Sequence, residues 1–202
     1  LIFKMRPLWT LLNADHFHVI FTISNQLHPL WRLNVEVMTQ ILFVSARNTL
    51  FELLEDKKYL GAQPGIIASL HTWSKTLSLH PHLHCLVTGG GLVNKQWISV
   101  ARNYLLPFRV ARKLFRGKFL DGIRKALHKG ELILPDGMRP QQLDNLLNKL
   151  GRKKWNVHLK ETYSHGKGVL TYLARYLRGG PISNKRILDC SDGKVTFSCG
   201  RV

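Results

Sequence analysis

The chain has 202 residues, of which 45% are hydrophobic, enough to fill a core and to exclude disorder for the chain as a whole. The longest apolar stretches are interrupted within about ten residues, so we expect no membrane span. Thirty Lys and Arg residues against twelve Asp and Glu give a formal net charge of +18, which indicates a polyanionic partner, most commonly nucleic acid. Three cysteines without C-x-x-C spacing argue against a disulfide framework or a four-cysteine zinc site and favour the reducing cytoplasm.

The first half of the chain reads mainly as strands around one long helix. Residues 16–24 alternate apolar and polar side chains around β-branched residues, which predicts a strand. Residues 34–56 carry apolar side chains at helical spacing and predict a helix. Residues 65–73 and 81–88 predict two more strands joined by a polar turn. The second of these ends in three glycines, after which residues 92–100 could add another strand.

The second half begins with a basic segment. Residues 108–129 hold eight Lys and Arg residues and one acid, with apolar residues at helical intervals. This pattern predicts a pair of helices with one basic face, broken at Gly117. Residues 141–150 predict a shorter helix, and residues 155–161 predict a strand.

The last part of the chain predicts a helix over 168–177 and a hairpin of residues 181–188 with 194–199. Together the elements predict an α+β fold, in which an antiparallel sheet carries helices on one face.

The most unusual segment is the histidine-rich strand. Alternate residues of a strand share a face, so His80, His82 and His84 point one way while the apolar residues between them point the other. His71 lies on the preceding strand, across a hairpin, and could face the same side. Imidazoles two residues apart on a rigid strand can converge on one metal ion. The alternative is a set of packed or solvated histidines.

A second constellation lies on the helix predicted at 168–177. Tyr172 and Tyr176 sit only about 40° apart around that helix, at the edge of its apolar stripe. Arg175 falls on the tyrosine side and Arg178 on the polar back. The alternative is two tyrosines that pack as amphipathic aromatics. A metal-binding histidine strand facing a tyrosine helix is a plausible site for cleaving a phosphodiester, with a phosphotyrosine as the product.

With these residues in view, the chain resembles the two-tyrosine HUH transposases, a bacterial insertion-sequence family related to Helitrons and rolling-circle replication initiators. The resemblance runs from near residue 16 to near residue 188. The segments that carry it are Phe17-His18-Val19-Ile20-Phe21-Thr22, Leu70-His71-Thr72-Trp73, His80-Pro81-His82-Leu83-His84-Cys85, Gly89-Gly90-Gly91, Tyr172-Leu173-Ala174-Arg175-Tyr176 and Ile182-Ser183-Asn184.

The resemblance implies a ferredoxin-like (RRM-like) nuclease core that nicks and rejoins single-stranded DNA at element ends and in target DNA. In this family a His–hydrophobic–His motif, matched here by His82 and His84, binds Mg²⁺ or Mn²⁺. The third metal ligand varies; we favour His71 because the hairpin can bring it beside the pair, with His80 and His18 as the other candidates.

The resemblance also implies that Tyr172 and Tyr176 are the nucleophiles, which take the 5′ phosphate in rolling-circle transposition. We expect residues 1–202 to form a single HUH-type transposase core, a fragment without the zinc ribbon that usually precedes it in the family. As a bacterial transposase it would act in the cytoplasm, on nucleoid DNA. We expect DNA contacts from six arginine and lysine residues: Arg109, Arg112, Lys113, Arg116, Arg175 and Arg178.

Two other interpretations remain from the sequence. The first is a non-catalytic basic module that binds single-stranded nucleic acid, or a decayed transposase remnant. The second is a metal-dependent hydrolase that activates water, which would need His82 and His84 but not the tyrosines. Such hydrolases usually offer a carboxylate near the metal, and the strand around these histidines has none.

Overall fold

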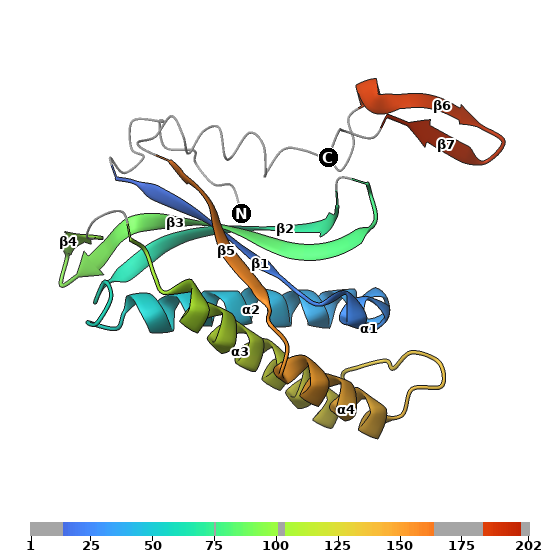
Figure 1. Ribbon diagram of the computed structural model, residues 1–202, viewed down its shortest axis with the longest axis horizontal. Helices are drawn as coiled ribbons and strands as arrows, with labels where there is room; N and C mark the ends of the chain where they lie inside the picture. The colour runs from blue at the N-terminus through green and yellow to red at the C-terminus, as the bar shows by residue number, and fades with distance from the viewer. Residues whose placement is uncertain (1–13, 75, 101–103, 164–183, 199–202) are drawn as a thin grey trace.

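A five-stranded antiparallel sheet with helices on one face forms the body of the molecule (Figure 1). The computed structural model describes residues 14–74, 76–100, 104–163 and 184–198. This architecture confirms the predicted α+β class. The elements in chain order are β1 (His16–Thr22), α1 (His28–Leu33), α2 (Val35–Leu54), β2 (Gln63–Trp73), β3 (Leu79–Val93), β4 (Gln96–Ser99), α3 (Phe108–His128), α4 (Pro140–Gly151), β5 (Asn156–Tyr163), β6 (Ile187–Ser191) and β7 (Lys194–Phe197).

The strands of the sheet lie in the order β2-β3-β1-β5, and β4 pairs with the far end of β3. Each neighbouring pair is antiparallel. The chain therefore leaves β1 through α1 and α2, returns at the β2 edge, and reaches the opposite edge at β5 only after α3 and α4. This βαββαβ connection with a split β-α-β unit is the ferredoxin-like arrangement.

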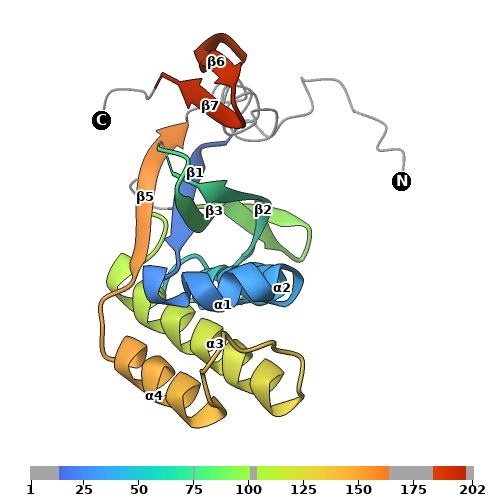
Figure 2. The same ribbon diagram turned by 90° about the vertical axis from the view of Figure 1, so that its right-hand side faces the viewer.

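The core lies between the sheet and the helices beneath it. Residues of the two central strands that face the helices are paired in register: Phe17 with Val87, Val19 with Cys85, Phe21 with Leu83. All six are buried, as is the stripe of α2 formed by Met38, Leu42, Ala46, Leu50 and Leu54. The ring centroid of Phe21 lies 4.9 Å from that of Phe115, so α3 also closes this layer. Figure 2 shows α4 outside α3, on the side away from the sheet.

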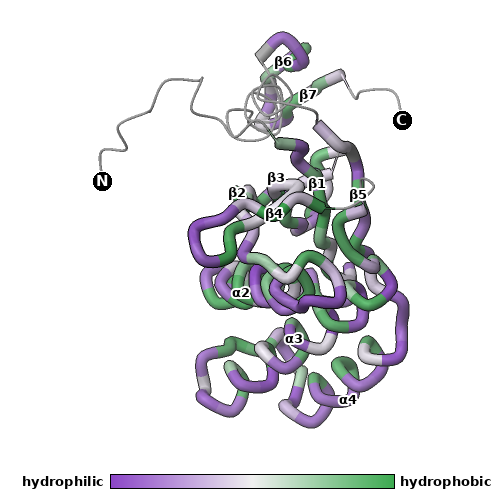
Figure 3. The backbone as a smooth tube through the Cα atoms, turned by 90° about the vertical axis from the view of Figure 1, so that its left-hand side faces the viewer, coloured by the Kyte–Doolittle hydropathy of each residue, from purple (hydrophilic) through white to green (hydrophobic). Residues whose placement is uncertain are grey.

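The prediction of a break at Gly117 is wrong, because α3 is one continuous helix of 21 residues. Phe115 and Phe119, on either side of the glycine, both pack against Trp155, with ring centroids 5.8 and 5.7 Å away. A glycine inside a helix costs only about 1 kcal/mol, which this aromatic packing outweighs. In Figure 3, green and purple segments alternate along α3 and α4, as expected for helices with one buried stripe.

Strand β3 also departs from the prediction, because it continues through the three glycines to Val93. A Cβ on Gly90 would come within 2.5 Å of the carbonyl oxygen of Ile98, and one on Gly91 within 2.5 Å of that of Gln63. Neighbouring strands approach so closely here that only glycine fits. The strand expected at 92–100 is therefore split between the end of β3 and β4.

Two hairpins turn through residues with positive φ. Asn94 and Lys95 join β3 to β4 with φ of 48° and 68°, and Asp192 and Gly193 join β6 to β7 with φ of 52° and 70°. These are the two-residue turns that suit the twist of a hairpin. The predicted C-terminal hairpin is thus present over 187–197, whereas the helix predicted at 168–177 lies outside the described residues. None of the described helices combines the length and apolar character needed to cross a membrane.

Two alanine substitutions test this packing as a matched pair. We expect Gly90→Ala to lower the free energy of unfolding by about 2 to 4 kcal/mol, because the new methyl group would collide with the β4 backbone. Gly117→Ala should raise it by about 0.5 to 1 kcal/mol, since nothing lies within 4 Å of its Cβ position. Urea denaturation measures both changes. Equal midpoints for Gly90→Ala and the parent chain would contradict the close approach of β3 and β4.

Candidate metal centre

The sheet face opposite the helices is rich in histidine. Because paired residues of antiparallel strands share a face, the register gathers seven of the chain's ten histidines there. We call this surface the histidine face. Its histidines are His16 and His18 on β1, His71 on β2, His80, His82 and His84 on β3, and His158 on β5.

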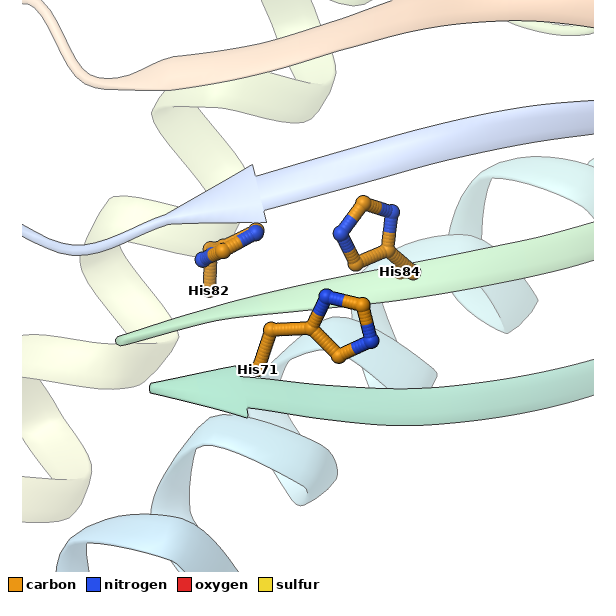
Figure 4. Close-up of side chains that lie close together, drawn as sticks. All are labelled: His71, His82 and His84. Carbon is orange, nitrogen blue, oxygen red and sulfur yellow. The ribbon is translucent and has the colours of Figure 1, made fainter. Parts of the chain in front are cut away.

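Three of these histidines form a cluster with metal-ligand spacing. The candidate ligand atoms of His71, His82 and His84 all lie within 4.8 Å of one another. His71 pairs directly with His82 across the β2–β3 ladder, and His84 is the next residue on the same side of β3. Figure 4 shows a ring nitrogen of each directed into the space between the three rings. The structure thus brings together the three residues predicted as metal ligands.

The two other candidates for the third ligand flank the cluster. The Nδ1 atom of His82 donates a hydrogen bond to the carbonyl oxygen of His80, 2.6 Å away, which leaves Nε2 to face the cluster. The Nδ1 atom of His84 lies 2.7 Å from Nε2 of His18. Such outer hydrogen bonds fix the tautomer and orientation of a metal-binding imidazole. Among the residues that the structure describes, His71, His82 and His84 form the only group of three or more potential metal ligands.

Burial keeps His82 and His84 neutral at physiological pH. Desolvation lowers the pKa of His82 to about 4; the hydrogen bond to the His80 carbonyl opposes this shift, and the charges of His80, His71 and Lys160 add to it. Desolvation also lowers the pKa of His84 to about 2, helped by His82, His71, His18 and Lys160. A neutral imidazole offers the lone pair that a metal ion requires, so no proton has to leave either ring before binding.

The donor set consists of three imidazole nitrogens, which bind a metal ion without contributing negative charge. Because neutral ligands do not reduce the charge of a bound ion, they leave it a stronger Lewis acid than carboxylates would. Mg²⁺ prefers oxygen ligands, whereas imidazole readily binds transition metals. The residues present therefore fit a divalent cation, and they fit Mn²⁺ better than Mg²⁺.

The four described basic residues predicted to contact DNA lie on α3 and are not part of this cluster. Arg109 and Lys113 are exposed on the first turns of α3. Arg112 donates through Nε to the carbonyl oxygen of Val157 at 2.9 Å, which ties α3 to β5. Arg116 donates to the carbonyl oxygen of Lys153 at 2.6 Å. These arginines have a structural role, and DNA contacts by the four α3 residues remain a prediction.

The remaining predicted site residues lie outside the described part of the chain: Tyr172, Tyr176, Arg175 and Arg178. The structure adds Lys160, which sequence reasoning missed, because its charge acts on His82 and His84. The sequence did contain a signal for Lys160: in the strand predicted at 155–161, alternate residues share a face, which places Lys160 on the same face as His158. His18 was named only as a possible ligand; the structure places it behind His84 instead.

Comparison with known proteins places the chain in a family. A family model described as "Putative transposase" (Y2_Tnp) matches residues 65–201. The chain belongs to the two-tyrosine transposase family of bacterial insertion sequences. It is 36% identical over 193 residues to "Putative transposase y4qJ" of Sinorhizobium fredii, covering 93% of this chain and 48% of that protein.

A second relative of this transposase chain is the "Transposase for insertion sequence element IS801" of Pseudomonas savastanoi pv. phaseolicola. It is 26% identical over 191 residues, which cover 87% of this chain and 42% of the relative. The chain thus spans about half the length of the curated transposases it matches. No solved structure gives a significant match.

The lowered pKa values predict a pH-dependent stability in the metal-free protein. Histidines in the unfolded chain have a pKa of about 6.5. Below that pH the unfolded chain therefore binds protons that His82 and His84 do not bind in the folded protein. Stability should be fully present above about pH 7 and decline as the pH falls toward the folded pKa of His82, about 4. Urea denaturation in EDTA at several pH values measures this decline. The double variant His82→Gln/His84→Gln should show a shallower dependence, and an unchanged one would contradict the assignment.

Proposed function

We propose that this chain forms the catalytic core of a transposase that cuts and rejoins single-stranded DNA through a covalent tyrosine–DNA bond. The observation that carries the proposal is the triad His71, His82 and His84, gathered on one sheet face with ligand atoms within 4.8 Å of one another, in which outer hydrogen bonds orient His82 and His84. Membership of the two-tyrosine transposase family supports the same chemistry. The chain spans about half the length of its relatives. That it takes part in complete transposition is therefore also a proposal.

In this proposal the triad holds a divalent cation, Mn²⁺ or Mg²⁺, whose chemistry is to polarise a phosphate oxygen and orient the scissile bond. His82 and His84 present Nε2 toward the cluster, and His71 supplies the third nitrogen from the neighbouring strand. The outer contacts hold the rings before substrate arrives, so little reorganisation accompanies binding.

Tyr172 and Tyr176 are the proposed nucleophiles. The bond from the tyrosine oxygen to phosphorus forms as the bond from phosphorus to the 3′ oxygen breaks. The phenol loses one proton and the 3′ oxygen gains one, so the products are a 5′-phosphotyrosine and a free 3′ hydroxyl. The phosphoester is conserved, which lets a 3′ hydroxyl attack it later and rejoin DNA without a nucleotide cofactor. Two tyrosines allow two successive strand transfers.

The tyrosine assignment is tested by trapping the adduct. Labelled single-stranded DNA carrying the ends of the parent element, incubated with protein and Mn²⁺, should yield a band on a denaturing gel that runs above the free protein. We expect EDTA to abolish it and Tyr172→Phe/Tyr176→Phe to reduce it by about three orders of magnitude or more. Tyr104→Phe, which removes an exposed phenol elsewhere, is the matched control and should leave the band intact.

Two results would refute the proposal. An adduct that persists in the double tyrosine variant would mean that another residue is the nucleophile. Salt-sensitive DNA binding by the parent chain without any adduct on this substrate would favour the non-catalytic module.

The metal proposal is tested at His18, a positioning residue. A ligand bond through Nε2 of His84 requires the proton on Nδ1, which then donates to Nε2 of His18. Removing that acceptor with His18→Phe should weaken Mn²⁺ binding by about 10- to 100-fold, whereas His18→Gln keeps an acceptor near the same point and should preserve most of it. Calorimetric titration measures the affinities without requiring activity.

The control for this series is His128→Gln, which changes an exposed histidine far from the cluster in sequence. Unfolding midpoints of both His18 variants separate lost metal binding from lost stability. Equal Mn²⁺ affinities for His18→Phe and the parent chain would contradict the role of this hydrogen bond.

A further inference from the structure

Two basic segments that are distant in the sequence meet at the edge strand β5. The first half of α3 contributes one set of cations, and the residues that follow α4 contribute the other. The hydrogen bond from Arg116 to the carbonyl of Lys153 joins the two segments, and that from Arg112 to Val157 holds α3 against β5. We call the combined patch the β5 basic surface; it comprises Arg109, Arg112, Lys113, Arg116, Arg152 and Lys154.

Acidic residues are scarce in the sequence that builds this surface: neither residues 101–120 nor residues 145–160 contain an Asp or Glu, and Glu161 is the one acidic residue of β5. The four ion pairs between described residues all lie elsewhere: Lys118–Glu52, Arg124–Asp144, Lys125–Asp121 and Lys129–Glu131. The second half of α3 is therefore largely neutralised, and the first half is not. A concentrated, uncompensated positive field of this kind attracts a polyanion.

The surface leads directly to the metal-ligand cluster. At the end of the sheet, His82 pairs with Thr22, and Thr22 pairs in turn with Asn156 on β5. At the spacing of adjacent strands, Asn156 lies about 10 Å from His82. A hollow of about 200 Å³ opens at this point, with Thr22, Asn156, Lys153 and Lys154 among its lining residues. Hydroxyl, amide and ammonium groups together are suited to phosphate oxygens.

We propose that the β5 basic surface and this hollow bind the sugar-phosphate backbone of the single DNA strand that enters the cluster. This assignment rests on the proposed function, and it adds the path of the substrate. The path turns around a sheet edge over about 10 Å, far less than the persistence length of duplex DNA, about 50 nm. A single strand follows such a turn readily, whereas a duplex would have to kink.

The test compares two quadruple variants, each of which lowers the formal net charge from +18 to +14. One removes exposed cations of the β5 basic surface: Arg109→Gln, Lys113→Gln, Arg152→Gln and Lys154→Gln. The matched control removes exposed lysines elsewhere: Lys57→Gln, Lys58→Gln, Lys125→Gln and Lys129→Gln. Fluorescence anisotropy with a labelled single strand of mixed sequence measures affinity at several salt concentrations, and a duplex of the same sequence is titrated in parallel.

We expect the surface variant to bind the single strand more weakly than the control variant, by roughly tenfold or more. The slope of the logarithm of its binding constant against the logarithm of salt concentration should be smaller in magnitude by about 2 to 3. Its unfolding midpoint and Mn²⁺ affinity should match those of the control. Equal single-strand affinities for the two variants would overturn the proposal. A loss confined to the duplex would overturn the single-strand assignment.

These outcomes are independent of the adduct experiment. If the parent chain forms no adduct but the surface variant still loses single-strand affinity, the binding surface stands and the nuclease function fails. If the adduct forms and the two variants bind the single strand equally well, the proposed nuclease function is supported, and the DNA strand follows a path other than the β5 basic surface.

Discussion

The pleat of β3 is the constraint on which the rest of the site depends. Leu83, Cys85 and Val87 point into the core and are buried there, so His82 and His84 must point to the opposite face. A slip of one residue against β1 would drive both imidazoles into the apolar layer and expose three core side chains, which fixes the register strongly. Cys85 belongs to the packing side of this arrangement, because burial raises the pKa of its thiol and keeps it protonated.

Sequence periodicity was sufficient to predict the elements whose formation is determined by local contacts. Period-two patterns predicted β1 and β2 and the two faces of β3, and the apolar spacing of 34–56 predicted α2, although the short helix α1 before it was not foreseen. The short connection between β2 and β3 also made the approach of His71 to His82 predictable. In each case the signal extends over a few residues, within reach of one strand, one helix or one hairpin.

The predictions failed or stopped short where distant contacts decide the structure. The packing of Trp155 against α3 overrides the propensity of Gly117 to break the helix. The contact between His18 and His84 joins residues 66 apart, and that between Arg116 and Lys153 joins residues 37 apart. No local pattern encodes either distance. The tyrosine helix was predicted from the same kind of local signal as α2, but it lies outside the described residues and stays a prediction.

The placement of charge connects the two proposed binding events. The three imidazoles contribute no negative charge, and Lys160 and the net charge of +18 oppose the approach of a cation. A DNA phosphate beside Asn156, about 10 Å from His82, would lie near one Debye length of the cluster and would offset that repulsion. Coupling between two ligands is reciprocal, so a bound cation would strengthen the hold on DNA by the same factor. On this proposal, a metal site without carboxylates on so basic a protein would gain part of its affinity for the cation from the bound DNA. The site would then be fully assembled only when a DNA strand is in place.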